Sequence, residues 1–285
     1  MGRERGCCGS GAGEPGRLPA DSEKIVEKVR ERYGRIADGG ACGCGPAGEL
    51  ATALAIGYAK GDLADLPAGA NLGLGCGAPV EALDPRPGET VLDLGSGAGM
   101  DALLAARGVG PAGRVIGVDM TPSMIEKARA HAAAAGLPHV EFREGRLERL
   151  PVESASVDAV TSNCVINLVP AKAAVFREIA RVLKPGGRLV ISDIVLDGRL
   201  PEAVGRDLLA YVGCVAGAME RDEYFRGVRD AGLGEIRILR DVDFLATGAC
   251  VLPDDLLASL AREGVTPRDF EGKVRSVTFR AVKPA

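Results

Sequence analysis

The sequence predicts an α/β fold in which a mostly parallel sheet carries helices on both faces. From residue 90 onward, short and continuously apolar runs alternate with helical stretches, a pattern typical of strands that are buried on both faces. A glycine-rich turn follows the first apolar run directly and leads into a helix, as in nucleotide-binding α/β sheets. The 285 residues suffice for one large domain with a smaller attached region.

The individual elements follow from local spacing and from turn residues. Residues 21–37 have apolar side chains at helical spacing, residues 47–59 predict a short helix, and residues 69–88 read as a glycine- and proline-rich loop. The expected strands and helices of the core alternate in this order: strand 90–95, helix 101–109, strand 114–120, helix 122–136, strand 139–145, strand 156–163, helix 171–184 and strand 187–195. Helical stretches 201–217 and 222–231 and strands 235–244 and 273–283 complete the chain.

Composition excludes several functional classes. The formal net charge is -4, which gives no electrostatic footprint for nucleic acid. No apolar run approaches the length of a membrane span, and the glycine-rich N-terminus lacks the apolar core of an export signal. We therefore expect a cytoplasmic protein with no nucleic-acid or membrane partner. We divide it into a flexible tail (1–20), an N-terminal domain (21–200) and a C-terminal region (201–285).

Cysteine and histidine usage limits the chemistry. Eight cysteines are present without any C-x-x-C spacing, so they indicate thiols, metal or metalloid ligands, or redox groups rather than a zinc finger or a disulfide framework. The only histidines, His131 and His139, flank one loop. We therefore expect a site that works without a histidine base.

The glycine turn, "VLDLGSGAGM", points to a bound nucleoside. Gly95, Gly97 and Gly99 allow a tight turn and close backbone approach by a ligand. Met100 departs from the dinucleotide pattern. Asp119 closes the next apolar run, where a carboxylate can accept hydrogen bonds from both ribose hydroxyls. The alternative is a tight turn followed by a strand-end acid, with no ligand.

These segments resemble the class I S-adenosylmethionine-dependent methyltransferases. "VLDLGSGAG" is similar to the family's first motif around the methionine moiety, "VIGVDM" to the second, and "RVLKPGGRLVISD" to the motif before the fifth strand. The resemblance implies the Rossmann-like class I fold, with an α+β C-terminal accessory region, and S-adenosylmethionine as cofactor. The implied cofactor-binding residues are Asp93, Gly95, Ser96, Gly97, Gly99, Asp119, Met120, Leu147 and Asn163.

A narrower resemblance, to arsenite methyltransferases, covers nearly the whole chain. It is carried by "GANLGLGCG", "VIGVDMTPSM", "VEFREG", "SNCVINLVP", "RVLKPGG" and "YVGCVAGA". It implies that Cys76, Cys164 and Cys214 bind arsenic(III), with a fourth catalytic thiol at Cys44 or Cys42. Thiolates suit this soft centre, whose lone pair would attack the sulfonium methyl group without a general base. The resemblance further implies arsenic detoxification. If two of the cysteines close into a disulfide during turnover, Cys76 with Cys44 is the favoured pair, and the resemblance then implies glutathione or thioredoxin as reductant. We expect a monomer.

Three positions depart from this family. Arg146 stands where the family usually has an acid near adenine, which makes Leu147 the expected contact. Ala78 stands where asparagine is common. Cys42 and Cys44 are separated by one residue where microbial members often have adjacent cysteines, so the functional one of the two stays open.

Each site residue also has a structural interpretation. Cys164 and Cys214 could be inert core cysteines. For Cys7, Cys8 and Cys250 we expect no catalytic role, or a contribution to metalloid capture before catalysis. Asn163 could be a cap or turn residue, and we interpret Asp193 as a solvated strand-end acid. Two other functions remain: a class I methyltransferase acting on carbon or oxygen of a quinone, sterol or small metabolite, and a thiol-rich arsenite-binding protein without catalysis.

Overall fold

The computed structural model describes residues 21–39, 48–205, 215, 217–247, 258, 260–269 and 271–285. The predicted tail and the cysteines Cys7, Cys8, Cys42, Cys44, Cys214 and Cys250 lie outside these residues. Among the residues described, no helix is both long enough and apolar enough to cross a bilayer.

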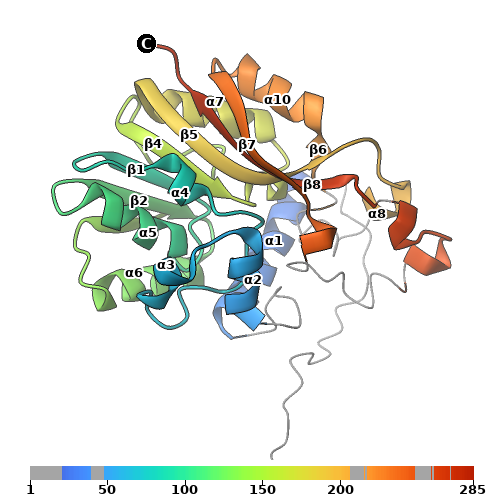
Figure 1. The fold of residues 1–285 in the computed structure, drawn as a ribbon, viewed down its shortest axis with the longest axis horizontal. Helices are drawn as coiled ribbons and strands as arrows, with labels where there is room; N and C mark the ends of the chain where they lie inside the picture. Colours follow the sequence, from blue (N-terminus) through green and yellow to red (C-terminus); the bar gives the residue numbers. More distant parts are fainter. Residues whose placement is uncertain are drawn as a thin grey trace, which may run out of the picture.

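A twisted mixed sheet forms the centre of the molecule, with helices on both faces (Figure 1). Its strands lie in the order β3-β2-β1-β4-β5-β8-β7, and the short β6 pairs with β5 beside this path. The strands β1 to β5 are parallel to one another, whereas β8 runs antiparallel to β5 and to β7. Their bounds are Thr90–Leu94 (β1), Arg114–Asp119 (β2), Val140–Glu144 (β3), Val157–Asn163 (β4), Leu183–Leu196 (β5), Met219–Glu220 (β6), Gly234–Asp243 (β7) and Val274–Val282 (β8).

Helices connect the strands and cover the sheet. They are Ser22–Ala37 (α1), Gly48–Ile56 (α2), Lys60–Ala64 (α3), Pro79–Leu83 (α4), Met100–Val109 (α5), Pro122–Ala134 (α6), Lys172–Val182 (α7), Glu202–Gly205 (α8) and Arg221–Asp230 (α10). Short 3-10 helices span Ile166–Leu168, Leu245–Thr247 and Pro267–Asp269.

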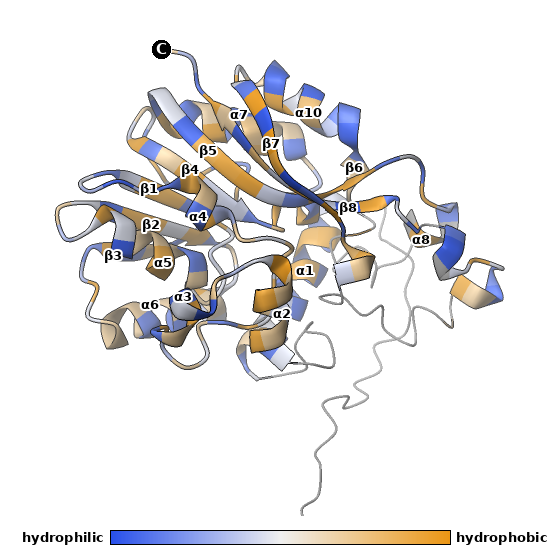
Figure 2. Cartoon of the chain, in the orientation of Figure 1, coloured by the Kyte–Doolittle hydropathy of each residue, from blue (hydrophilic) through white to orange (hydrophobic). Residues whose placement is uncertain are grey.

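The central strands β1, β4 and β5 are largely buried on both faces, whereas β7 at the edge of the sheet has many exposed side chains. In β1, Leu92 and Leu94 pack in a cluster with side chains of α7 and α10. Val91, which points to the other face, packs in a second cluster with side chains of α4, α5 and α6. Hydrophilic residues lie on the outer sides of the covering helices, as along α10 (Figure 2). Alternating side chains therefore fill two cores, as the continuous apolar runs predict.

The strand order reverses between β1 and β4, and this reversal positions the site. Neighbouring loops leave the carboxyl ends of these two strands in opposite directions there, which opens a crevice. The glycine turn follows β1, and the cysteine-bearing segment follows β4. These segments touch, because a Cβ added to Gly95 would collide with the side chain of Val165. The two most informative motifs of the sequence thus meet at the place where such sheets bind ligands.

The structure confirms the α/β class and most predicted elements, and it corrects others. Residues 69–88 are not loop throughout, because α4 forms within them, with Pro79 at its first position and Asp84 ending it at φ 52°. The predicted C-terminal strands exist, and they extend the main sheet beyond β5. Of the predicted helix 201–217, the described part is helical only in α8.

An ion pair between a buried arginine and a part-buried glutamate ties β5 to the segment before β1. Arg188 lies 2.7 Å from Glu89 and donates to the carbonyl oxygens of Leu83 and Asp84 at 2.8 and 2.6 Å. We expect Arg188→Met to lower the free energy of unfolding by about 3 kcal/mol, because it leaves a part-buried carboxylate without its cation and two carbonyl oxygens without their donor. Urea unfolding measures this loss. Lys28→Ala, which removes an ion pair whose side chains are about half exposed, is the control and should cost below about 1 kcal/mol. Equal effects would contradict the expectation.

Candidate active site

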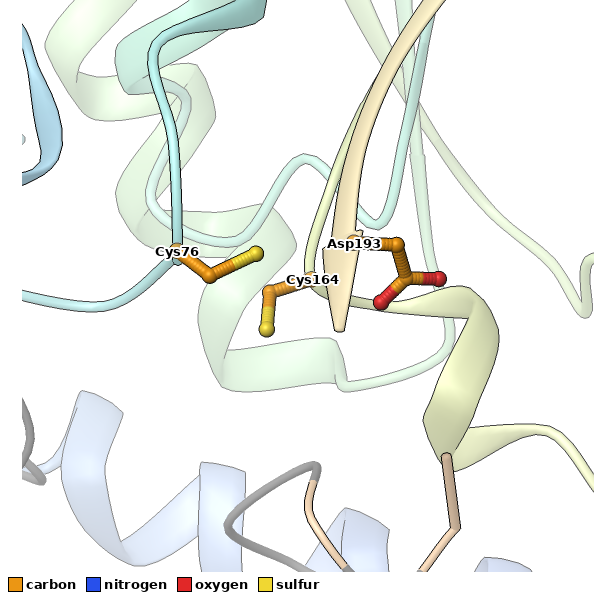
Figure 3. Close-up of side chains that lie close together, drawn as sticks. All are labelled: Cys76, Cys164 and Asp193. Carbon is orange, nitrogen blue, oxygen red and sulfur yellow. The ribbon is translucent and has the colours of Figure 1, made fainter. Parts of the chain in front are cut away.

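Two cysteines and one aspartate converge near the carboxyl end of β4, beside β5. Cys76 comes from the loop before α4, Cys164 follows β4 and Asp193 lies on β5 (Figure 3). All three are buried, and the two sulfur atoms and a carboxylate oxygen lie within 4.8 Å of one another. Such a set of soft and hard donors can hold a thiophilic ion or metalloid.

Cys164 has an unusual backbone conformation. Its φ is 56°, in the left-handed region that non-glycine residues rarely adopt. Its N–H donates to the carbonyl oxygen of Ser192 at 2.8 Å, which holds the residue against β5 while the chain turns into the 3-10 helix Ile166–Leu168. Strained residues of this kind concentrate at functional sites. The conformation favours a functional role over the inert core cysteine that the sequence also allows.

The prediction that Asp193 is a solvated strand-end acid is wrong. Only 1% of the surface of Asp193 is exposed, and β5 continues beyond this residue to Leu196. Its carboxylate accepts hydrogen bonds from Asn167 Nδ2 at 2.8 Å, from Tyr224 Oη at 3.0 Å and from the Ile194 N–H at 3.0 Å. Burial raises the pKa of Asp193 to about 7. The sequence carries no signal for this residue, since an acid near a strand end looks the same whether water or thiols face it.

Apolar side chains surround the two thiols. Cys76 and Cys164 belong to one buried cluster that includes Val29 of α1, Phe244 and Val274. Partly buried side chains, among them Tyr33 of α1 and Met120, pack against this cluster. A ligand held by the thiols would therefore sit among apolar walls that limit the access of water.

The glycine turn forms a cradle next to the thiols. Gly95, Gly97 and Gly99 all have positive φ, at 66°, 51° and 96°, as the predicted tight turn requires. A Cβ on Gly97 would meet no atom within 4 Å, so the turn presents open backbone there. Asp119 accepts from the Gly97 N–H at 3.0 Å and from the Thr121 N–H at 2.8 Å. The predicted acid thus lies against the turn.

The cradle fits S-adenosylmethionine. Asp93, Asp101 and Asp119 gather there, and burial is the largest cause of the raised pKa of each carboxyl; that of Asp101 is about 6. Asp93 Oδ2 and Ser96 Oγ are buried and have no hydrogen-bond partner in the described part of the chain. Buried acids and an unpartnered hydroxyl suit a ligand that carries positive charge and hydroxyl groups, as this cofactor does in its sulfonium, ammonium and ribose groups.

The remaining predicted residues have separate placements. Met120 packs beside the thiol cluster, whereas Leu147 is buried in the core that also holds Val118. Arg146 pairs with Glu23 of α1 at 2.8 Å and with Glu148 at 2.9 Å. The cofactor contacts assigned to Met120 and Leu147 stay predictions. Cys214, Cys44 and Cys42 lie outside the described residues.

Three polar residues lie together near the site, and two of them were not singled out from the sequence. Tyr58, Asp101 and Asn163 form a hydrogen-bonded group beside Cys76. Tyr58 and Asp101 had no sequence signal, because their contact joins residues far apart in the chain. The cofactor contact assigned to Asn163 stays a prediction, and in the structure its amide forms hydrogen bonds with the loop that carries Cys76.

Comparisons with known proteins give the family. A methyltransferase domain family matches residues 85–232. An arsenite methyltransferase of Halobacterium salinarum is 42% identical over 93% of this chain and 68% of its own length. One from Mus musculus is 41% identical over 45% of this chain and 37% of its own. The solved structure of an arsenic(III) S-adenosylmethionine methyltransferase from Chlamydomonas reinhardtii, 32% identical, superposes with a TM-score of 0.60 over 82% of this chain and 73% of that one. The chain belongs to the arsenite methyltransferase family of class I S-adenosylmethionine-dependent methyltransferases.

Proposed function

We propose that this protein transfers methyl groups from S-adenosylmethionine to trivalent arsenic, first to arsenite and then to methylarsenite. One observation carries the proposal: Cys76 and Cys164 bring two buried sulfur atoms together beside the cofactor cradle. A methyltransferase that acts on carbon or oxygen has no use for paired thiols there.

A third thiolate completes the proposed arsenic site. Cys214 is the candidate, because the next residue, Val215, is buried in the same cluster as Cys76 and Cys164. Residues 201–285 would then be the arsenic-binding and C-terminal region, and residues 21–200 the cofactor-binding domain. Cys44, with Cys42 as the alternative, is the proposed fourth catalytic thiol.

The chain's own residues supply positioning rather than proton transfer. Each thiol that displaces a hydroxide from arsenite gives up its proton to that hydroxide, which leaves as water. The three thiolates then hold arsenic as a trivalent pyramid with a lone pair. S-adenosylmethionine, when bound, supplies an electrophilic methyl group on a sulfonium sulfur. Because Gly95 packs on Val165, the cradle and the thiol segment keep a fixed separation, which is what an in-line transfer needs.

The proposal extends to the conditions of turnover. Transfer of a methyl cation to the lone pair leaves arsenic formally pentavalent. Cys76 and Cys44 would return it to the trivalent state by giving up two electrons and closing into a disulfide, which glutathione or thioredoxin would then reduce. We propose that the protein works in the cytoplasm, where such reductants are present, and that it acts as a monomer in arsenic detoxification.

Incubation of the purified protein with arsenite, S-adenosylmethionine and glutathione tests this function. We expect methylated arsenicals, separated by chromatography and identified by mass. If calorimetry shows cofactor binding but arsenite stays unmethylated, the result would support the alternative function, a methyltransferase acting on carbon or oxygen. If S-adenosylmethionine gives no binding heat at all, the protein is an arsenite binder without catalysis.

A further inference from the structure

We propose that Asn163 is a positioning residue that fixes the main chain of Cys76 relative to the cofactor cradle. This inference rests on the proposed function, since it concerns how one arsenic-binding thiol keeps its place. It replaces the cofactor contact that the sequence predicts for Asn163.

The amide of Asn163 is committed to the loop that carries Cys76. Its Oδ1 accepts from the N–H of Cys76 at 3.0 Å and from the N–H of Gly77 at 3.4 Å. Its Nδ2 donates to the Gly77 carbonyl oxygen at 2.7 Å and to Tyr58 Oη at 2.9 Å. A side-chain amide has two acceptor sites and two donor hydrogens, so these four bonds use its whole capacity. Nothing remains for a cofactor.

The same amide is anchored to the helix that the glycine turn opens. Tyr58 Oη donates to Asp101 Oδ1 at 2.6 Å, and Asp101 Oδ2 lies 3.4 Å from Asn163 Nδ2. Asp101 is in the first turn of α5, directly after Gly99 and Met100. Both Tyr58 and Asp101 are buried. A network in which every member has its partners is rigid, and this one runs from the cofactor-binding helix to the thiol loop.

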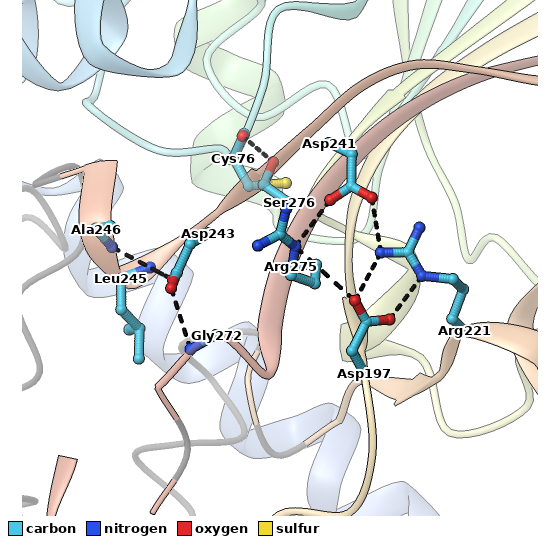
Figure 4. A network of polar contacts seen from close by, with 10 residues as sticks. All are labelled: Cys76, Asp197, Arg221, Asp241, Asp243, Leu245, Ala246, Gly272, Arg275 and Ser276. Carbon is cyan, nitrogen blue, oxygen red and sulfur yellow. Dashed lines mark hydrogen bonds and ion pairs between the residues drawn. The ribbon is translucent and has the colours of Figure 1, made fainter. Parts of the chain in front are cut away.

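The other side of Cys76 is fixed by β8. Ser276 Oγ donates to the Cys76 carbonyl oxygen (Figure 4). The preceding residue on that strand, Arg275, pairs with Asp241 of β7 at 2.8 Å. Asn163 and Ser276 therefore hold the N–H and the carbonyl group of the same residue from two parts of the sheet.

The loop has no room to move toward the amide. Gly75 has a φ of 113°, and a Cβ added there would lie 2.8 Å from Asn163 Nδ2. The glycine thus lets the main chain approach the amide closely. Removing the amide would leave a gap under the loop as well as unsatisfied backbone groups, so the Cys76 thiol would lose its fixed place.

Asn163→Ala should therefore affect transfer more than cofactor binding. A displacement of about 1 Å can cost on the order of 100-fold in rate, so we expect the methyl-transfer rate at saturating cofactor to fall by at least about 10-fold. The dissociation constant of S-adenosylmethionine should change by less than about 3-fold, because the amide makes no cofactor contact.

Three measurements on the full-length chain test the inference: amide hydrogen exchange of residues 73–78, cofactor affinity by calorimetry, and single-turnover methylation of arsenite. Tyr58→Phe removes only the hydroxyl that joins Asn163 to Asp101, and it should give a smaller effect in the same direction. If Asn163→Ala does not fold, the same three measurements on Tyr58→Phe test the inference. The matched control is Asn71→Ala, in the same loop, whose side chain accepts from the Gly73 N–H at 2.9 Å; its transfer rate should match the parent's.

Faster exchange at Cys76 and Gly77, slower transfer and unchanged cofactor affinity would support the inference. Unchanged exchange would overturn it, and so would a cofactor affinity reduced about 10-fold or more, which would make Asn163 a cofactor contact. If the parent protein forms no methylarsenicals, the proposed function fails, while the exchange and affinity measurements still decide whether Asn163 fixes Cys76.

Discussion

Cys164→Ser is expected to abolish the formation of methylarsenicals while cofactor affinity is retained. Serine has nearly the same shape as cysteine, but its hydroxyl is a poor ligand for a soft, thiophilic centre. Cys164 does not contribute to the glycine turn, and its N–H bond to Ser192 does not depend on the side chain. The substitution therefore removes one arsenic ligand and leaves the cofactor cradle intact. Cys76→Ser should give the same result.

Chromatography of the arsenic products, with cofactor affinity measured in parallel, checks this expectation. Cys250→Ser is the control and should keep the parent's activity, because Cys250 is not assigned to the arsenic site or to the cofactor site. Cys214→Ser should behave like Cys164→Ser if Cys214 is the third ligand. Turnover that persists in Cys164→Ser would remove this thiol from the arsenic site and favour the inert core interpretation.

The location of the site could be predicted because it depends on strand pattern alone. The apolar runs fix which segments are strands, and parallel pairing brings their carboxyl ends to one edge. Cys164 and the glycine turn each follow a strand, so their proximity was predictable. Cys76 could be assigned only through resemblance, because its place depends on a loop whose path no periodicity encodes.

Asp193 and Asn163 show what the sequence could not reveal. Whether an acid is solvated depends on the elements that pack over it, here Tyr224 of α10 and Asn167 after β4. Asn163 could serve a cofactor or a loop equally well on local grounds. Its hydrogen bonds to Cys76 and Tyr58 join residues 87 and 105 positions away, and contacts at such separation leave no trace in local spacing.

The cofactor cradle gives the second large expected effect, through Asp119. A buried carboxylate that accepts two ribose hydroxyls contributes about 1.5–3 kcal/mol through each charged hydrogen bond. Losing both bonds costs about 3 kcal/mol or more, so we expect Asp119→Ala to weaken S-adenosylmethionine binding by at least about 100-fold. Asp119→Ala also removes the hydrogen-bond acceptor of the Gly97 N–H, so the glycine turn becomes less rigid. Calorimetry measures the loss, and an unchanged dissociation constant would remove Asp119 from the cofactor pocket.

The pH dependence of cofactor binding separates the charge of Asp119 from its shape. Burial raises the pKa of this carboxyl, and its ionised form is the acceptor for the hydroxyls. As the pH falls through the raised pKa, the carboxylate gains a proton and cofactor affinity should fall. Asp119→Asn keeps the size and one acceptor oxygen but does not titrate, so its affinity should depend less on pH. Asp93 and Asp101 also have a raised pKa, but they are common to both proteins. The difference between the two pH profiles therefore belongs to Asp119, and identical profiles would show that this residue binds the cofactor without its charge.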